Sequence, residues 1–261
     1  MYMDLKWGKG VNMNNDIMKH KYDKDFIGDD PDTDNYQLRD DLLFLYRKFL
    51  PNGKLFDLQK GNDIKYDYLI WNNWRFASDS ITNTYTLHKK YQWMIKDLEK
   101  TYFYSSLIKE YREIDYTIGC HILFPKNNNK DLPRTWTINQ ARGINQKIAD
   151  RMDLTLECIR RYYNNDKENP LYGKLQENSY FFDLFKDKNG NNGFKGYVDF
   201  FYLNDLLLNN DYSRIAFFLP FDNFKRNPKP QTTDEWKVFC ENQINFVKAR
   251  NQRISKSINN S

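Results

Sequence analysis

Charged and amide side chains that could bind an anion gather between Arg134 and Tyr163, the stretch of the chain with the strongest helical character. A guanidinium group recognises phosphate through paired hydrogen bonds, and a helix start adds a favourable field for negative charge. With a helix start near Ile138, the residue types predict a site for a phosphorylated ligand. The side chains expected to bind it are Asn139, Gln140, Arg142, Arg151, Arg160 and Arg161.

The same residues allow a purely structural interpretation. Glu157 follows Asp153 by four positions and Arg161 follows Glu157 by four, so the three side chains form a ladder on one helix face. Each ion pair of this kind stabilises a helix by about 0.2–0.5 kcal/mol. Arg160 and Arg161 point about 100° apart on a helix, so at most one of them joins a given face. Spacing alone leaves both interpretations open.

A second candidate site surrounds the tripeptide Ser78-Asp79-Ser80, which Arg75 precedes by three positions. In an enzyme, Asp79 would act as a general base or a metal ligand. Asp153 and Glu157 are the other carboxylates that could serve as acid, base or metal ligand. The structural alternative is that the tripeptide caps a helix or closes a turn. The sequence does not decide whether the protein is an enzyme.

Several familiar sites are excluded. Asp30, Asp32 and Asp34 alternate like the ligands of a calcium loop, but Asn35 stands where that loop needs glycine and Pro31 intrudes. The chain has 3 histidines, too few and too scattered for a zinc site or a Ser-His-Asp arrangement. The glycine-rich phosphate motifs GxxxxGK[ST] and GxGxxG do not occur. The sequence therefore predicts no metal site, and it indicates no particular cofactor.

Composition limits the class of protein. The 261 residues carry 40 Lys and Arg mixed with 35 Asp and Glu, so the net charge of +5 does not mark a dedicated nucleic-acid binder. Mean hydropathy is −0.87, yet aromatic residues make up 17%, which argues against disorder. No apolar run reaches the roughly 20 residues of a membrane helix. The 3 cysteines form no CxxC motif and fall in apolar segments, which predicts buried free thiols and a cytoplasmic protein without a signal peptide.

Hydrophobic periodicity predicts the elements that position these residues. Helices are expected over residues 38–49, 88–111, 138–148, 153–163, 170–185 and 232–250. Strands are expected over residues 55–58, 66–71, 74–78, 116–124 and 215–219. The apolar run 197–208 fits helix or strand. Expected boundary signals are a cap at Asp34, a second cap at Asp153, a strand end at Pro125, and a capping box from Thr232 to Glu235.

This mixed order favours an α+β fold with about six helices packed on a small sheet of short strands. Residues 1–28 are predicted to be a polar N-terminal arm, in which Trp7 or Phe26 could dock. Residues 29–250 are predicted to form a single domain. Residues 251–261 are predicted to be a polar, basic tail in which the last helix frays.

Six blocks of sequence carry a resemblance to a known family: LPNG (50–53), FASDSI (76–81), YTIG (116–119), INQARG (138–143), DLTLECIRRYY (153–163) and GYVDFF (196–201). With them the chain resembles an uncharacterised family of bacterial and phage-associated proteins, held as a domain of unknown function, over residues 22–250. Met152 stands where phenylalanine is common in that family. The resemblance implies a bacterial or phage cytosolic protein and assigns no catalytic residue.

Two functional hypotheses follow. In the first, the protein binds a nucleotide or a nucleic-acid backbone through the arginine-rich helical segment. In the second, it is a non-catalytic module that recognises another protein, and its arginines form structural ion pairs. A concave pocket where the arginines converge would favour the first hypothesis. Paired arginines with an apolar patch elsewhere would favour the second.

Overall fold

The computed structural model describes residues 17–22, 35–61, 69–72, 74–82, 102–126 and 137–260, with residues 102–105 described by their backbone alone. The helices are α1 (Tyr36–Tyr46), α3 (Tyr102–Asp115), α4 (Ile138–Ile144), α5 (Met152–Tyr163), α6 (Tyr172–Glu177), α7 (Ser179–Asp183), α8 (Gly193–Phe200) and α9 (Thr233–Asn259), and the 3₁₀ turns are η4 (Ile118–Cys120), η5 (Asn204–Leu206) and η6 (Leu208–Asn210). The strands are β1 (Lys48–Phe49), β2 (Leu55–Phe56), β3 (Gln59–Lys60), β4 (Leu69–Trp71), β5 (Trp74–Ser80) and β6 (His121–Lys126). The prediction of an α+β fold is confirmed.

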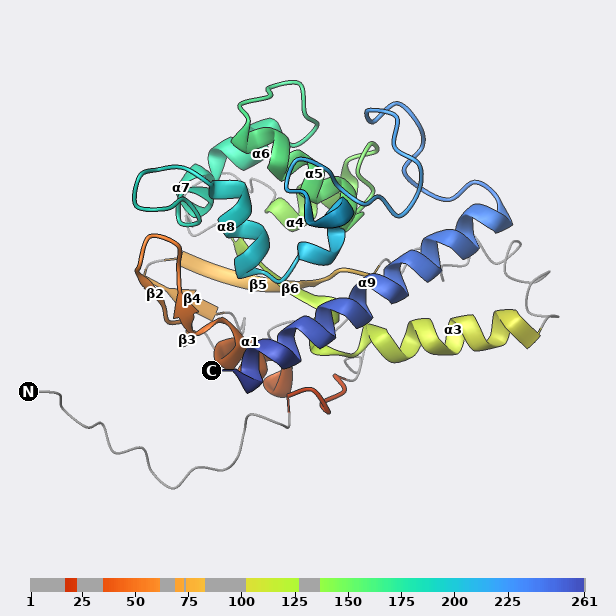
Figure 1. The fold of residues 1–261 in the computed structure, drawn as a ribbon, viewed down its shortest axis with the longest axis horizontal. Coiled ribbons are helices and arrows are strands. Elements are labelled where there is room, and N and C mark those ends of the chain that lie inside the picture. Colours follow the sequence, from red (N-terminus) through yellow and green to blue (C-terminus); the bar gives the residue numbers. More distant parts are fainter. Residues whose placement is uncertain are drawn as a thin grey trace, which may run out of the picture.

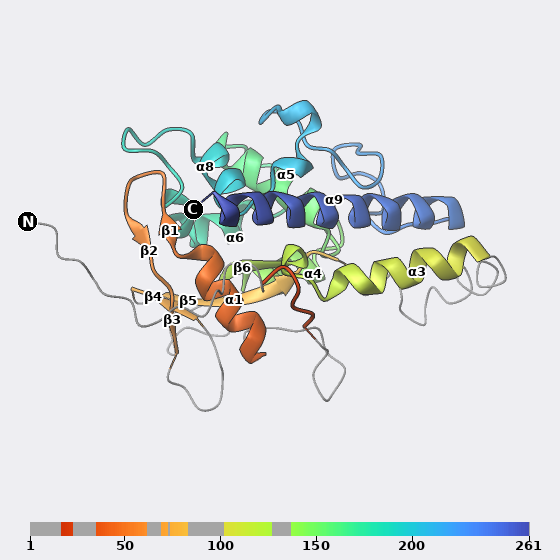
Figure 2. The same ribbon diagram turned by 60° about the horizontal axis from the view of Figure 1, so that its bottom comes forward.

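The strands form two antiparallel sheets, a pair β1-β2 and a four-stranded sheet in the order β3-β4-β5-β6. Helices α4 to α8 gather on one side of the long β5-β6 pair (Figure 1). Helix α9 runs across the molecule with α3 beside it, and both views show the two helices side by side (Figures 1 and 2). One cluster of buried apolar side chains joins residues from the N-terminal segment, the sheet and the helices.

The strand predicted over residues 116–124 begins later than expected. Residues 118–120 form a 3₁₀ turn, in which the amide of Cys120 donates to the carbonyl of Thr117 at 2.9 Å. The strand starts at His121 and continues through Pro125, so the prediction that Pro125 ends it is wrong. Proline is tolerated because β6 is the last strand in the described sheet and pairs on one side only.

The tripeptide Ser78-Asp79-Ser80 was expected to form a turn or a helix cap, and this expectation is wrong. All three residues lie in β5 and pair with β6, with Asp79 opposite Ile122. The apolar residues before them, including the buried Phe76, extend the strand, and hydrogen bonds to β6 then satisfy the backbone of the polar residues. Asp79 is therefore held on a regular strand.

The first predicted helix is present as α1, but it ends at Tyr46, and residues 48–49 form β1 instead. The cap of α1 is Asn35, whose side chain accepts the amide of Leu38 at 3.0 Å. Asp34 lies outside the described residues, as do Trp7 and Phe26. In the N-terminal segment that is described, Ile17 and Tyr22 are buried.

The central helices differ from their predicted bounds. Helix α4 ends at Ile144, earlier than predicted, because the chain turns through Ala149 and Asp150, both with positive φ. Helix α5 begins at Met152, close to the predicted break. Its N-cap is Arg151, which makes no side-chain capping bond, so the prediction of Asp153 as the cap is wrong. The side chain of Asp153 binds Arg151 instead.

Three further predictions are settled. The ambiguous run 197–208 contains the end of α8 and the turn η5. The predicted strand 215–219 is reduced to a single bridge between Leu207 and Ile215. Of the long helix predicted over 88–111, the described part is the beginning of α3, which runs to Asp115. Among the described residues, no helix is long and apolar enough to cross a membrane.

The C-terminal helix starts where predicted. The hydroxyl of Thr232 accepts the amide of Glu235 at 3.2 Å, and the carboxylate of Glu235 accepts the amide of Gln231 at 2.8 Å. In a capping box the second bond joins the Glu side chain to the amide of the cap residue, here Thr232. In this helix it joins Glu235 to the amide of Gln231, the residue before the cap. The prediction that the helix frays beyond Arg250 is wrong, because α9 continues to Asn259 and buries Ile254 and Ile258.

Arg250 of α9 is fully buried and holds distant segments together. Its guanidinium donates to the carbonyls of Gly119 at 2.7 Å, His121 at 2.9 Å and Phe201 at 3.1 Å, and to the hydroxyl of Tyr46 at 3.1 Å. These acceptors belong to η4, the start of β6, the residue after α8, and α1. One side chain thus ties the last helix to four parts of the fold.

We expect Arg250→Met to lower the free energy of unfolding by about 3 kcal/mol or more, because it leaves several buried carbonyls without donors. Urea denaturation followed by circular dichroism measures the change. Lys256→Met is the matched control, since Lys256 is exposed on the same helix. Equal unfolding free energies for the two variants would show that Arg250 does not hold these segments together.

Candidate functional site

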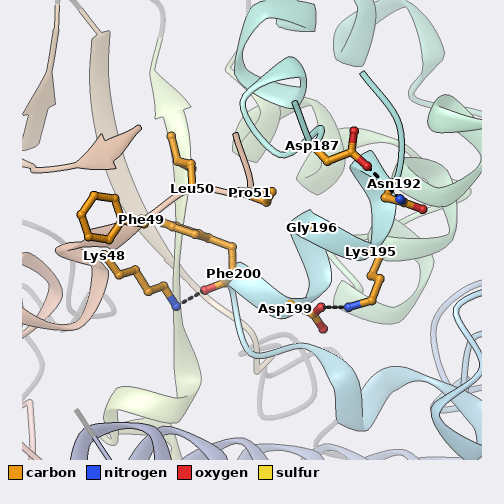
Figure 3. Close-up of a pocket in the computed structure, with 10 residues that line it drawn as sticks. All are labelled: Lys48, Phe49, Leu50, Pro51, Asp187, Asn192, Lys195, Gly196, Asp199 and Phe200. Carbon is orange, nitrogen blue, oxygen red and sulfur yellow. Dashed lines mark hydrogen bonds and ion pairs between the residues drawn. The ribbon is translucent and has the colours of Figure 1, made fainter. Parts of the chain in front are cut away.

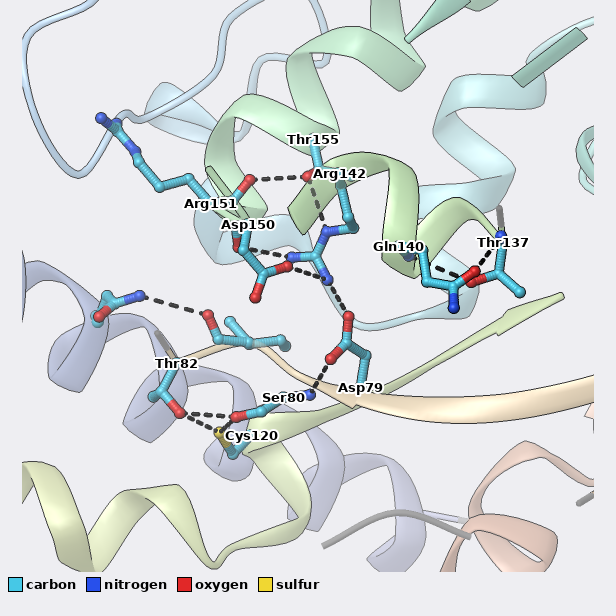
Figure 4. Close-up of polar contacts among 12 residues, drawn as sticks. Asp79, Ser80, Thr82, Cys120, Thr137, Gln140, Arg142, Asp150, Arg151 and Thr155 are labelled. Atoms are coloured by element: carbon cyan, nitrogen blue, oxygen red, sulfur yellow. Dashed lines mark hydrogen bonds and ion pairs between the residues drawn. The ribbon is translucent and has the colours of Figure 1, made fainter. Parts of the chain in front are cut away.

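Arg142 lies at the centre of a buried polar cluster between the sheet and the helices (Figure 4). Its Nε donates to the hydroxyl of Thr155 at 3.1 Å, and one Nη donates to the carbonyl of Asp150 at 2.9 Å. The other Nη forms ion pairs with Asp79 and, at 3.3 Å, with Asp150. Each donor group therefore has a partner, and the cluster joins β5 to α4 and α5.

The neighbouring carboxylates favour the protonated, charged form of Arg142. Burial lowers the pKa of Arg142, but the carboxylates of Asp150 and Asp79 outweigh it and raise that pKa above its ordinary value. Burial also raises the pKa of the Asp150 carboxyl, against the opposing effect of Arg142. Arg142 is fully buried, so a ligand would have to displace two carboxylates to reach it.

Arg151 forms a separate buried cluster. Its guanidinium binds both carboxylate oxygens of Asp153 and donates to the carbonyl of Pro228 at 2.8 Å. Asp153 also accepts the amide of Phe218 at 2.8 Å. The pair therefore fixes the start of α5 against the 218–228 segment.

Glu157 binds both following arginines. Arg160 holds its two oxygens at 2.8 Å each, and Arg161 donates to it at 2.7 Å. The predicted pair of Glu157 and Arg161 is confirmed, but Asp153 takes no part in the ladder because it binds Arg151. Arg161 also donates to Asn223 at 2.6 Å, which connects α5 to the 220–226 loop.

The expected meeting of arginines in one hollow does not occur. Arg142 and Arg151 come from neighbouring segments but point apart, each towards its own carboxylates (Figure 4). Gln140 caps α4 together with Thr137. Asn139 is half-buried with its Oδ1 lacking a partner, an acceptor that does not suit an anion, and Arg75 is a half-buried residue of β5 opposite Lys126.

A hollow of about 420 Å³ at the far end of α5 was missed from the sequence. It lies between the last turn of α5, the 186–193 loop and the start of α8. Its cationic side chains are Arg160, Lys186 and Lys195. The sequence carries a signal for it in KDKNGNNGFK (186–195), where glycines and asparagines, which favour turns, stand between lysines.

The loop before α8 has a defined geometry. The carboxylate of Asp187 accepts the amides of Asn189 at 2.9 Å and Asn191 at 3.0 Å, and the side chain of Asn192 at 2.9 Å. These bonds lower the pKa of Asp187. Asn192 adopts a left-handed conformation with φ of 57° and makes no side-chain capping bond to α8. The first amides of α8 therefore have no side-chain cap, and Gly193 and Phe194 are among the residues that line the hollow.

A second hollow of about 330 Å³ lies on the other side of Lys195 (Figure 3). It shares Asn192 and Lys195 with the first hollow. Lys48, Pro51 and Phe200 line the side opposite them.

The described part of the chain contains no cluster of metal ligands and no reactive cysteine. No group of three or more His, Cys, Asp or Glu side chains there could hold a metal ion. The cysteines are free and buried, as predicted, and burial raises the pKa of Cys120 to about 12. That thiol is inert at neutral pH.

A double-mutant cycle tests whether Arg142 is a structural residue. We expect Arg142→Met alone to cost about 3–5 kcal/mol in unfolding free energy, since it removes the guanidinium from Asp79 and Asp150. The loss in the double variant Arg142→Met with Asp79→Asn should be smaller than the sum of the two single losses. Arg112→Met, at an exposed position of α3, is the control. Additive losses would mean that Asp79 and Arg142 are not coupled. Urea titrations give the four free energies.

Comparison with known proteins identifies the family and no activity. No curated protein and no solved structure shows a significant match to the chain. One family model matches residues 16–254, which include the described helices α1 and α3 to α8 and most of α9. The chain belongs to the family of unknown function DUF6994.

Proposed function

We propose that this protein binds a phosphorylated small molecule in the hollow at the start of α8. Support comes from one observation above all: the uncapped start of α8 and three cationic side chains, those of Arg160, Lys186 and Lys195, line the same hollow. Of the arginines predicted to bind the ligand, Arg160 remains in this site. Arg142 and Arg151 hold the surrounding helices.

The helix start supplies donors that folding has not used. The first amides of a helix have no partner within it, and they carry a partial positive charge. Asn192 leaves them uncapped because its side chain binds Asp187. A phosphate oxygen would accept these amides in the manner common at helix starts.

The three cations are held at the rim of the hollow. Lys186 pairs with Asp183 at 2.6 Å, Lys195 pairs with Asp199, and Arg160 pairs with Glu157. The Lys186 and Lys195 side chains are 40% and 54% exposed, so each can turn from its surface carboxylate to a ligand at small cost. This exposure distinguishes them from Arg142.

Size favours a small ligand over a nucleic-acid backbone. A hollow of about 420 Å³ falls in the range of roughly 300–1,000 Å³ that small-molecule sites occupy. A nucleic-acid backbone would need an extended row of cations, whereas 40 basic and 35 acidic residues are mixed along this chain. We therefore favour a nucleotide or another phosphorylated metabolite, in a bacterial or phage protein of the cytoplasm. Asp79, Asp153 and Glu157 have no catalytic role in this proposal.

A protein-interaction module is the second candidate. The observation in its favour is a group of exposed apolar side chains on α1 and the β1-β2 pair, including Phe49 at 71% exposure, Phe44 and Leu55. The buried ion pairs of Arg142 and Arg151 agree with this alternative as well. It assigns no role to the hollow at α8.

Calorimetric titration with pyrophosphate, ATP and adenosine tests the phosphate site. We expect the two phosphate compounds to bind and adenosine to bind far more weakly, since the amides and cations recognise the phosphate. Lys186→Gln should weaken pyrophosphate binding by about tenfold, the loss of one charged hydrogen bond. Lys225→Gln is the matched control, because Lys225 is exposed and outside the hollow.

Two results would contradict the proposal. One is a lack of heat from both phosphate compounds at millimolar concentration. The other is equal binding by the Lys186→Gln and Lys225→Gln variants.

A further inference from the structure

Lys48 occupies an unusual position at the edge of the second hollow (Figure 3). Its ammonium group donates to the carbonyl of Phe200 at 2.5 Å. It lies 3.7 Å from the ring centre of Tyr202 and 4.5 Å from that of Phe200. Aromatic rings and a carbonyl therefore surround the nitrogen on one side.

No carboxylate of the described residues forms an ion pair with Lys48. Arg250 is a second cation in the same region, because both side chains lie at Tyr46: the guanidinium donates to the Tyr46 hydroxyl at 3.1 Å, and the Lys48 ammonium lies 5.7 Å from the ring centre. Arginine stays protonated inside proteins. Of these two cations in one interior region, Lys48 is the one that can lose its proton.

Burial and two neighbouring charges act on the pKa of Lys48. Burial, followed by the charge of Arg250, lowers the pKa of Lys48 well below its ordinary value. Asp199 acts in the opposite direction, but its carboxylate already binds Lys195, Tyr212 and Asn204. The aromatic rings favour the ammonium form as well, but the net direction of the shift is downward because burial is its largest cause.

The hollow gives this amine room for a substrate. Its volume is about 330 Å³, and its walls combine the apolar Pro51 and Phe200 with the polar Asp187 and Lys195. In Figure 3 the amine points to the carbonyl of Phe200, and Lys195 and Asp199 lie beyond Phe200. All four residues line the hollow, whose volume suits a small molecule with a polar group.

We propose that this hollow is a covalent site in which Lys48 captures a small aldehyde or ketone as an imine. The nitrogen lone pair forms a bond to the carbonyl carbon while the electron pair of the C=O bond moves to oxygen. The two hydrogens of the amine leave with that oxygen as water, so a C=N bond replaces the C=O bond and no oxidant or reductant is needed. A lysine desolvated beside another cation is activated for this step. The site does not depend on phosphate binding in the neighbouring hollow.

Reductive ethylation of the native full-length chain tests the site directly. The protein is treated at pH 7 with acetaldehyde and sodium cyanoborohydride, which traps the imine, and peptide mass spectrometry follows each lysine. Each unit by which a lysine pKa is lowered raises its neutral fraction about tenfold. We expect Lys48 to be ethylated at least about tenfold faster than Lys54, an exposed lysine six positions away.

Matched variants and a denatured sample complete the test. Lys48→Arg should remove the fast reaction, and Lys54→Arg should leave it unchanged. In 8 M urea the two lysines should react at the same rate, since the surroundings of Lys48 are then lost. If Lys48 reacts no faster than Lys54 in the native chain, the rings hold an ordinary ammonium and the proposal is overturned. That comparison uses the unaltered chain, so it stands even if a variant does not fold.

Discussion

The fold depends on satisfying guanidinium groups that are removed from water. Arg142, Arg151 and Arg250 are all at most 1% exposed. A buried charge without partners costs several kcal/mol, so each arginine fixes the position of whatever neutralises it or accepts its hydrogen bonds. Arg142 brings β5 to α4 and α5, Arg151 brings the 218–228 segment to α5, and Arg250 brings α9 to η4, α1 and the end of α8. Polar contacts thereby set the relative placement of elements whose apolar faces alone would allow several arrangements.

Sequence patterns within one helical turn correctly predicted the features that depend on contacts within that turn. The pair of Glu157 and Arg161 followed from a spacing of four, and the start of α9 followed from Thr232 and Glu235, because both signals lie within one helical turn. The role of Arg142 could not be predicted in this way. Its partner Asp79 is 63 positions away, and no spacing rule distinguishes a guanidinium that meets a distant carboxylate from one that faces a ligand. In the structure, Arg142 and Arg151 of the arginine-rich stretch bind carboxylates, and each contacts another segment of the chain.

Contacts between distant segments also explain the element boundaries that were predicted wrongly. The last part of α9 looks polar, and Ile254 and Ile258 become decisive only because the rest of the protein buries them. The run 215–219 has the composition of a strand but meets only a single bridging partner at Leu207. The 3₁₀ turn before β6 interrupts a regular alternation because Arg250 binds the carbonyl of Gly119. Tertiary contacts override propensity in all three cases.

The same constraint indicates where function can lie. Arg142 and Arg151 are themselves buried, so exchanging their carboxylates and carbonyls for a ligand would disturb paired charges in the core at a cost of several kcal/mol. In the part of the chain that the structure describes, groups around α8 are better placed to change partners: the uncapped amides at its start, the lysines at the rim of the first hollow, and Lys48 at the second. The amides and Lys195 belong to α8, Lys186 to the loop before it and Lys48 to β1, and α5 packs against α8. Such an arrangement separates the residues that hold the fold from those that can change partners, which is the condition for binding a ligand without loss of stability.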